Sequence, residues 1–388
     1  MPNPILDPAM LVSPVEGGYV AYDPASDQLH QLNPTAALIV ELCDGSRTAA
    51  EIDRLIAPIL AEGKSGEVER WIGEALKLGL LVSERSVAAL RCFSAEELYR
   101  LAQRLKEHGK IQTAYLCLKR VVEMSPEHWD AWYDLGDAAL NVGKRSEGRD
   151  AYQKYFERNP DDAEIEHLLI ALRDDAPPPR VSDRTIQCIY KDFADHYDTL
   201  MRDDLGYQGP ERMQDAIKGV IGDARGLEIL DLGCGSGLAG IGLKPFAGHL
   251  TGIDLSPEML ALAKARGLYD RLEVAEITDW LERSGERFDI IACCDCLIYF
   301  GDLHRIVGAA AKRLNGGGLF AMSMERGSRY PFTLTDTGRY QHHPDHVRDA
   351  AAEARMTIAR LDEAFLRMEY GTPVTAIYAV LTTNADRS

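Results

Sequence analysis

Two aspartates and a run of glycines in the C-terminal half of the chain have the spacing of a nucleoside-binding site. Asp231 ends the apolar segment LEIL and is followed by Gly233, Gly235 and Gly237, which lead into a helix. Glycine is required where a backbone takes a positive φ or approaches a ligand closely. Asp254 ends the next apolar segment, 19 positions after Gly235, where a carboxylate can accept two hydrogen bonds from vicinal ribose hydroxyls. The glycine pattern differs from the G-x-G-x-x-G turn of nicotinamide-binding proteins.

Strand and helix patterns alternate from about residue 186 onward, as in a doubly wound sheet. Ser256 and Pro257 follow Asp254 by two and three positions. They predict an N-cap and the first position of a helix. The segments EAFLRMEY and TAIYAVLTT, joined at Gly371, predict a closing hairpin. We therefore expect one α/β domain over residues 186–385.

Three of the eight cysteines, Cys293, Cys294 and Cys296, stand close together in FDIIACCDCLIYF. Such a cluster could ligate a metal, but the run is apolar and has strand character, and cysteine buries easily. We therefore predict a buried strand and no metal. The chain has no repeated Cys-x-x-Cys pair, which favours reduced thiols over a disulfide framework.

The motifs DLGCGSG and GIDLSPEML resemble those of the S-adenosylmethionine-dependent methyltransferases of the Rossmann-like class. The resemblance covers roughly the last half of the chain and implies a seven-stranded sheet whose last strand is antiparallel. It implies that the first aspartate and the glycine turn hold the methionine end of the cofactor, that Asp254 binds the ribose, and that the product is S-adenosylhomocysteine. Around the adenine it places Leu255, Met259, Ile277 and Glu276, the last where the family more often has Asp. The predicted cofactor-binding residues are Tyr190, Asp231, Gly233, Cys234, Gly235, Gly237, Asp254, Leu255, Met259, Glu276, Ile277 and Cys294.

The acceptor side of such a site would lie at the tip of the fourth strand and in the loops above it. Methyl transfer to a carboxylate or a thiolate needs no base, whereas an amide, an alcohol or an ammonium must lose a proton. The predicted catalytic residues are Asp295, Tyr299, Arg339 and His342. His342 could act as a base or, as the favoured alternative, cap the next helix at the surface, and Arg339 could hold an acceptor carboxylate or pair with a nearby Asp. The helical segment before the domain offers Tyr190, Tyr197 and Tyr207 as a lid.

Residues 10–85 predict a hairpin followed by three short helices, the pattern of a small winged-helix module. The run YDPASDQLHQLNPTAALIVELCDGSRTAAEI resembles the PQQ synthesis protein D family, the prototype of the peptide-recognition element in ribosomal peptide modification. The resemblance implies that a leader peptide adds as a strand to the hairpin edge while a helix supplies pockets. The predicted peptide-binding residues are Tyr19, Val20, Ala21 and Tyr22 on the edge, with Trp71 and Ile72 on the helix. The alternative is a packing or dimerisation module.

Residues 93–175 carry an internal repeat. Pro126 and Pro160 stand 34 positions apart, which is the tetratricopeptide period. Two repeats could form a peptide groove or only a rigid spacer. An amphipathic helix after Pro160 is expected to cover the end of the stack, and the proline-rich segment 173–185 predicts a domain boundary.

Composition limits the possible partners. The 388 residues carry a net charge of −18, which disfavours nucleic acid. The sequence has no apolar run long enough to cross a membrane and no signal-peptide pattern, so we expect a cytoplasmic protein. The combined hypothesis is a methyltransferase that modifies a precursor peptide captured by its N-terminal module. The alternatives are a small-molecule methyltransferase whose front domains serve assembly, and a non-catalytic peptide carrier that binds the cofactor.

Overall fold

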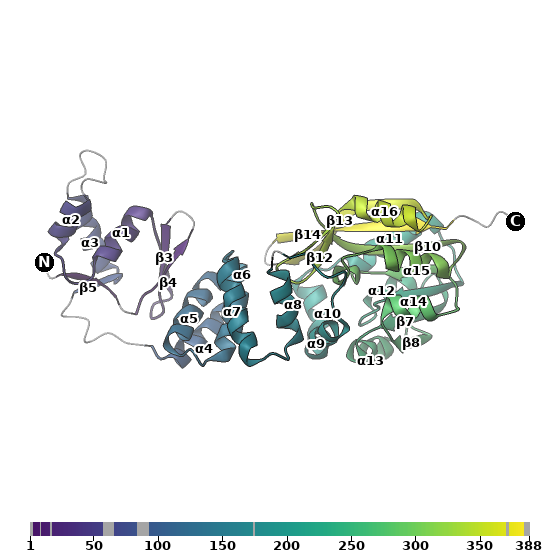
Figure 1. Cartoon of the computed structure of the whole chain (residues 1–388), viewed down its shortest axis with the longest axis horizontal. Coiled ribbons are helices and arrows are strands. Elements are labelled where there is room, and N and C mark those ends of the chain that lie inside the picture. Colours follow the sequence, from purple (N-terminus) through teal and green to yellow (C-terminus); the bar gives the residue numbers. More distant parts are fainter. Residues whose placement is uncertain are drawn as a thin grey trace. The chain divides into compact units, whose positions relative to one another are not determined.

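The computed structural model describes residues 3–7, 9–15, 18–56, 66–83, 93–173, 175–369 and 372–383. The chain divides into two compact units, Met1–Asn159 and Pro160–Ser388, coloured from purple to teal and from teal to yellow in Figure 1. The division falls before the boundary predicted at 173–185. Gly371 of the predicted closing turn lies outside the described residues.

The N-terminal part of the first unit is a winged-helix module built on a three-stranded antiparallel sheet. The sheet has the order β2-β3-β4, and Asn33 caps the first helix by accepting a hydrogen bond from Ala36 N at 2.8 Å. Its elements are β1 (Pro4–Leu6), β2 (Leu11–Val15), β3 (Gly18–Asp23), β4 (Gln28–Leu32), α1 (Pro34–Leu42), α2 (Ala49–Ile56), α3 (Glu67–Lys77) and β5 (Leu81–Ser83).

The strand β3 lies in the centre of this sheet, so the prediction that Tyr19–Tyr22 forms an exposed edge is wrong. Along its length β3 pairs with β2 on one side and with β4 on the other. Pro14 stands within β2, and a proline in a strand is tolerated at the edge of a sheet. The free edges of the three-stranded sheet are therefore those of β2 and β4.

Four helices of the first unit form two antiparallel pairs with tetratricopeptide spacing. They are α4 (Ala95–Glu107), α5 (Ile111–Met124), α6 (Trp129–Asn141) and α7 (Arg145–Arg158). A Cβ added at Gly136 would lie 2.4 Å from the ring of Tyr152, so only glycine lets α6 and α7 approach this closely. The helix after Pro160, α8 (Ala163–Ala171), is grouped with the second unit, and its role in covering the end of the stack stays a prediction.

The winged-helix module and the repeat share one hydrophobic core. Leu11, Val20 and Tyr22 of the sheet are buried in the same cluster as side chains of α4, α5 and α6. Lys144 Nζ also donates a hydrogen bond to the carbonyl of Pro14 at 3.0 Å. Removing the sheet would expose the apolar face of α5 to water, which is unfavourable in proportion to the uncovered area.

The second unit is built around a nine-stranded mixed sheet. Seven strands have the order β8-β7-β6-β9-β10-β14-β13. Within this order the pairs β10–β14 and β13–β14 are antiparallel. The two short strands are added at β10, where β12 pairs with β10 and β11 pairs with β12. The predicted seven-stranded fold and its closing hairpin are present, with these two short strands added. The strands are β6 (Leu227–Leu232), β7 (Ala247–Asp254), β8 (Arg271–Val274), β9 (Phe288–Cys293), β10 (Leu314–Arg326), β11 (Phe332–Leu334), β12 (Tyr340–His342), β13 (Thr357–Glu369) and β14 (Thr372–Thr382).

Helices cover both faces of this sheet and close two separate cores. One core packs α14, α15 and α16 on the sheet, and the other packs α11 and α12 on the opposite face. The helices are α9 (Asp183–Phe193), α10 (Tyr197–Thr199), α11 (Gly209–Ile221), α12 (Leu238–Leu243), α13 (Pro257–Arg266), α14 (Ile277–Arg283), α15 (His304–Arg313) and α16 (Pro344–Glu353), with the single turns η2 (Ala194–His196), η3 (Leu200–Asp204) and η4 (Leu297–Tyr299).

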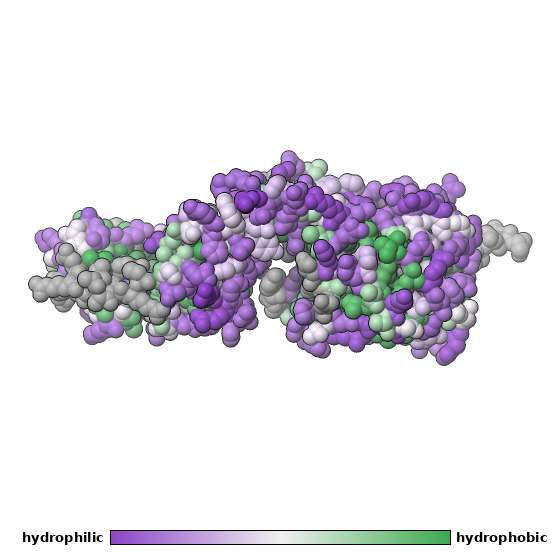
Figure 2. Space-filling view, turned by 90° about the horizontal axis from the view of Figure 1, so that it is seen from below, coloured by the Kyte–Doolittle hydropathy of each residue, from purple (hydrophilic) through white to green (hydrophobic). Residues whose placement is uncertain are grey.

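Hydrophilic side chains cover most of the face drawn in Figure 2, as the large net charge requires. Within the described residues, no helix is both long and apolar enough to pass through a bilayer.

Candidate active site

A glycine turn follows β6 at the carboxyl end of the parallel strands. Gly233, Gly235 and Gly237 have φ values of +65°, +53° and +89°, the left-handed region that favours glycine. A Cβ added at Gly233 would lie 2.4 Å from Cys296 Sγ. The turn therefore has both the conformation and the close packing that only glycine permits.

Asp254 joins the end of β7 to this turn. Its Oδ2 accepts a hydrogen bond from Gly235 N at 2.8 Å, and its Oδ1 accepts one from Ser256 N at 2.9 Å. Burial raises the pKa of Asp254, and the backbone hydrogen bonds partly offset that effect. The side chain is thus a fixed carboxylate that also lines a cavity.

Asp231 is fully buried at the end of β6. Its Oδ2 accepts a hydrogen bond from Tyr269 Oη at 2.6 Å, and its Oδ1 has no partner. Burial raises the pKa of Asp231 to about 7. An unpaired buried carboxylate oxygen is costly, and a ligand with a positive charge or an N–H group would satisfy it. Tyr269 could not be predicted from the sequence, because it follows α13 and lies outside both motifs.

A cavity opens between these strand ends and α9. It brings together nine of the predicted cofactor-binding residues with Asp295 and Tyr299. The cavity is lined by Arg180, Ile186, Tyr190, Tyr197, Gly233, Gly235, Asp254, Leu255, Met259, Glu276, Ile277, Cys294, Asp295, Cys296, Tyr299 and Phe300. Asp231, Cys234 and Gly237 support the turn without lining the cavity. Sequence reasoning missed Arg180, Ile186, Cys296 and Phe300, because no local motif marks them.

Glu276 occupies the N-cap of α14 at one end of this cavity. Its Oε2 accepts a hydrogen bond from Asp279 N at 2.7 Å, which satisfies one of the free amide groups of the helix. The carboxylate therefore has a structural role in addition to any contact with a ligand.

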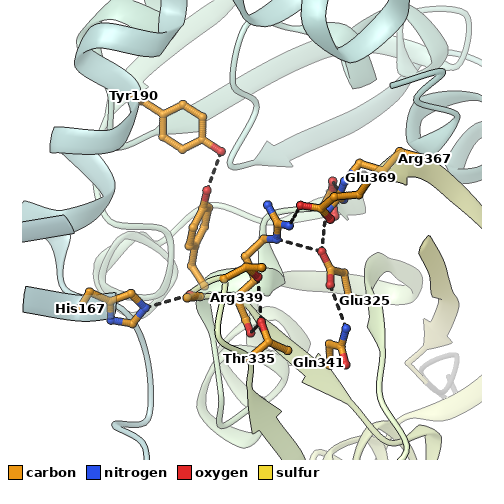
Figure 3. Close-up of polar contacts among 12 residues, drawn as sticks. His167, Tyr190, Glu325, Thr335, Arg339, Gln341, Arg367 and Glu369 are labelled. Atoms are coloured by element: carbon orange, nitrogen blue, oxygen red, sulfur yellow. Dashed lines mark hydrogen bonds and ion pairs between the residues drawn. The ribbon is translucent and has the colours of Figure 1, made fainter. Parts of the chain in front are cut away.

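A second cavity of about 390 Å³ lies beside the first and shares Tyr190, Tyr197, Asp295 and Tyr299 with it. The hydroxyls of Tyr190 and Tyr299 are 2.9 Å apart and hydrogen bonded across the boundary (Figure 3). Tyr207, the third residue of the predicted lid, places its hydroxyl 3.6 Å from Cys294 Sγ instead. Apolar side chains of α9, η3 and η4 form the walls, and Arg339, Arg367 and Glu369 contribute charge.

Arg339 pairs with glutamates rather than with an aspartate. Its Nε lies 3.1 Å from Glu325 Oε1, and its Nη2 contacts Glu369 (Figure 3). The Asp partner predicted from the sequence is therefore wrong, and the contact with an acceptor carboxylate stays a prediction. Glu325 and Glu369 belong to the strands β10 and β13. The sequence does not show which residues of these strands pair with which residues of β14.

His342 does not reach either cavity. It is fully buried in β12, with its Nδ1 3.2 Å from His346 Nδ1 and its ring 6.2 Å from that of Phe332. The helix cap that the sequence favoured for it is made by His343, whose Nδ1 accepts a hydrogen bond from Asp345 N at 3.2 Å. The structure therefore supports neither the base nor the surface cap at His342.

His342 and His346 should make the fold less stable as the pH falls below about 6.5. Burial lowers the pKa of each to about 4, whereas the unfolded chain binds protons at a pKa of about 6.5. Between these values the unfolded state binds more protons than the folded state. The free energy of unfolding therefore decreases as the pH decreases, by up to about 3 kcal/mol for His342. Urea unfolding at about pH 7.5 and pH 5 measures the loss. In His342→Gln the loss should be smaller, and an equal loss would count against this assignment.

The cysteine cluster forms the buried strand end that the sequence predicted. Cys293 is the last residue of β9 and is fully buried, and Cys294 and Cys296 line the first cavity. Elsewhere in the described part of the chain, one group has ligand atoms within 4.8 Å of one another, and it consists of Asp302, His304 and His346. His304 Nδ1 and Asp302 Oδ1 in that group are hydrogen bonded to each other at 2.7 Å.

Three family models match segments of the chain. Residues 229–318 match a methyltransferase domain. The second unit therefore contains a methyltransferase domain. Residues 105–172 match a tetratricopeptide repeat, and residues 18–81 match the family of coenzyme PQQ synthesis protein D. All three resemblances inferred from the sequence are thereby confirmed.

Relatives with curated names match part of the chain. The ubiquinone biosynthesis O-methyltransferase of Xylella fastidiosa is 34% identical over 151 residues, which are 35% of this chain and 61% of that protein. The enzyme of the same name from Bordetella avium is 29% identical over 184 residues, which are 42% of this chain and 74% of that protein. The chain thus spans about three fifths of the length of the first of these relatives.

Solved structures with a similar arrangement include two S-adenosylmethionine-dependent methyltransferases. The protein from Mesorhizobium loti gives a TM-score of 0.36 at 22% identity and covers 43% of this chain and 96% of its own. The protein from Clostridium acetobutylicum gives 0.37 at 19% identity and covers 51% of this chain and 100% of its own.

The first cavity of the methyltransferase domain fits S-adenosylmethionine by the chemistry of its lining. Asp254 offers a carboxylate to a diol, and Met259 and Ile277 offer apolar surface to a base. A Cβ at Gly235 would project to within 3.4 Å of the Met259 methyl, so the absence of a side chain keeps this part of the site open.

Proposed function

We propose that the chain is an S-adenosylmethionine-dependent methyltransferase that acts on a peptide captured by its N-terminal module. The observation that carries the first half is the buried carboxylate of Asp254, held by Gly235 N and Ser256 N at the mouth of a cavity next to a glycine turn. The match to a methyltransferase domain and the names of the curated relatives support it.

Each side chain of the first cavity has a role in this proposal. Asp254 accepts hydrogen bonds from the ribose hydroxyls, and Glu276 accepts one from the adenine amine, while Leu255, Met259 and Ile277 pack against the adenine. Asp231 and the glycine turn hold the charged methionine end. The cofactor supplies a methyl group already activated on a sulfonium, so these residues mainly orient it and exclude water.

The strand β4 and a groove beside it support peptide capture. Within the described residues, β4 pairs only with β3, and Leu29 on it is 46% exposed. A groove of about 390 Å³ between α1 and α3 begins at Asn33, directly after β4, and includes Trp71. An extended peptide could pair with a free edge and place alternate side chains in such a groove. Ile72, in contrast, is buried in the core of the module and offers no peptide contact.

Tethering gives a reason for one chain to hold both parts. The winged-helix module and the repeat form one unit with a shared core, so a peptide bound to β4 is held by a rigid body rather than by a flexible arm. A tethered acceptor reaches an effective concentration in the ~mM range, which compensates for weak binding at the methyltransferase domain.

The test uses the full chain and the product of a short open reading frame beside its gene, incubated with S-adenosylmethionine. The proposal predicts a gain of about 14 Da per transferred methyl group, lost when the leader half of the peptide is removed. Methylation of a free metabolite with no effect of the leader would instead support the second candidate, a small-molecule enzyme. That candidate is favoured by the mostly apolar lining of the second cavity and by the relatives named as O-methyltransferases. Cofactor binding without any methylated product would support the non-catalytic carrier.

A further inference from the structure

The floor of the second cavity of the methyltransferase domain is a cluster of five charged side chains. Four of them line the cavity, and the fifth, Glu325, does not line it but pairs with Arg339 and Arg367. The five side chains come from the segment after β9, from β10, from the residue before β12 and from β13, and most of them are nearly inaccessible to water (Figure 3). The five are Asp295, Glu325, Arg339, Arg367 and Glu369.

Both guanidinium groups of this floor are already engaged by carboxylates. Arg367 lies 3.4 Å from Asp295 Oδ2, 2.5 Å from Glu325 Oε1 and 3.3 Å from Glu369 Oε2. Arg339 contacts Glu325 and Glu369. Three carboxylates therefore face two guanidiniums, and the floor has one negative charge in excess when all are ionised.

Asp295 is the member of this cluster that both cavities share. Its Oδ1 is buried and has no hydrogen-bond partner, while Oδ2 faces Arg367. Its φ is +54°, and its backbone N–H donates to Ser323 Oγ at 2.9 Å. A left-handed backbone at an aspartate is uncommon, and strained residues of this kind cluster at functional sites. The backbone geometry holds a free carboxylate oxygen at the junction of the cavities.

The remaining lining of the second cavity is apolar or aromatic. Ile189, Leu200, Met201 and Ile298 form its walls together with the rings of Tyr190, Tyr197 and Tyr299. A group that enters would thus bury an apolar body and present its polar end to Asp295.

We propose that the second cavity holds the methyl acceptor and selects a nucleophile that carries a proton, an amine or a hydroxyl, over an ionised carboxylate. This inference rests on the proposed methyl transfer. A lone pair of the acceptor nitrogen or oxygen forms the new bond to the methyl carbon, and the carbon–sulfur bond breaks with its electron pair remaining on sulfur. An ammonium gives one proton to Oδ1 of Asp295 before its nitrogen attacks, and a hydroxyl gives its proton to the same oxygen as it attacks, so charge and atoms balance.

The electrostatics of the floor account for this selection. An acceptor carboxylate would approach Asp295 and Glu369 at low dielectric without a free guanidinium, and such like-charge contacts cost several kcal/mol. An ammonium or a hydroxyl would instead give Oδ1 of Asp295 the partner that it lacks. Burial raises the pKa of Asp295 to about 7, because its effect is larger than the opposite effect of the Arg367 charge. This value suits a base near neutral pH.

The test measures binding of two probes of equal size, benzylammonium and benzoate, to the full chain saturated with S-adenosylhomocysteine. At about pH 8 we expect benzylammonium to bind at least about tenfold more tightly than benzoate. In Asp295→Asn, also saturated with S-adenosylhomocysteine, this preference should shrink to about threefold or less. The matched control is Glu282→Gln, which removes an exposed partner of Arg305 and should keep the full preference.

Each other result overturns the inference in a recognisable way. If benzoate binds as tightly as benzylammonium, or if neither probe binds, the second cavity is not an acceptor site of this chemistry. The wild-type chain alone gives this result, so the conclusion holds even if the aspartate variant fails to fold. If the preference for benzylammonium is unchanged in Asp295→Asn, Asp295 does not cause it, and the inference is wrong. Absence of S-adenosylhomocysteine binding would instead overturn the proposed function on which the inference rests.

Discussion

Replacing Asp254 by Asn should weaken the binding of S-adenosylhomocysteine by about 100-fold. Both carboxylate oxygens accept backbone hydrogen bonds, from Gly235 and Ser256, and in the proposed site the same oxygens face the ribose hydroxyls. An amide turns one acceptor into a donor that opposes a backbone N–H. Losing charge-assisted hydrogen bonds costs about 3 kcal/mol in total, which corresponds to about two orders of magnitude in Kd. Titration calorimetry measures the change.

Asp289 provides a matched control for that substitution. It is an aspartate at the opposite, amino-terminal end of β9, and it accepts hydrogen bonds from Glu228 N at 3.0 Å and from Asn315 Nδ2 at 2.7 Å. Asp289→Asn therefore removes a similarly bonded carboxylate from the same sheet and should leave the Kd for S-adenosylhomocysteine within about twofold. Equal losses in both variants would mean that the effect of Asp254 is structural rather than due to ligand contact.

Replacing Trp71 by Ala should weaken binding of the precursor peptide by about 30-fold. Trp71 lines the groove between α1 and α3, which includes Asn33 directly after β4. Buried aromatic anchors supply about 2 kcal/mol or more at such interfaces. The affinity for S-adenosylhomocysteine should stay unchanged, because Trp71 belongs to the other unit. Fluorescence anisotropy of a labelled leader peptide gives the Kd.

The control for Trp71 lies at the end of the same helix. Leu78 follows α3, is 60% exposed and does not line the groove. Leu78→Ala removes exposed apolar surface from the module and should leave peptide binding within about twofold. A Trp71→Ala protein that is folded and binds the leader as tightly as the wild type would show that the groove does not receive the peptide.

Features encoded by neighbouring residues were predictable from the sequence. The glycine turn after Asp231 and the helix opened by Ser256 and Pro257 depend on local backbone requirements, and they appear in the structure where the sequence places them. The capping box at Ser94 and Glu97 is of the same kind, because each side chain bonds the backbone three residues away.

Features that depend on long-range strand pairing were not predictable. His342 was expected near the acceptor, but the parallel pairing of Arg326 with His342 sets the direction of its side chain. A strand of three residues is too short to show the alternation of apolar and polar side chains that would have predicted this direction. The central position of β3 depends on β2, whose Pro14 weakens the strand pattern.

Three residues of the charged floor, Glu325, Arg367 and Glu369, were missed for the same reason. Glu325 and Arg367 are 42 positions apart, and no local motif marks either of them as functional. Only the antiparallel pairing of β10 and β13 with the β14 strand between them brings the two charges into contact. Sequence motifs identified the cofactor side of the site, whereas the acceptor side required the fold.

Titration calorimetry of the intact chain with S-adenosylmethionine and with S-adenosylhomocysteine tests the central claim most directly. The account predicts that each ligand binds at one site per chain with a Kd in the micromolar range, a free energy of about −8 kcal/mol. A chain that is folded by circular dichroism and yet gives no binding heat with either ligand at several temperatures would contradict the assignment of the first cavity, and with it the proposed activity.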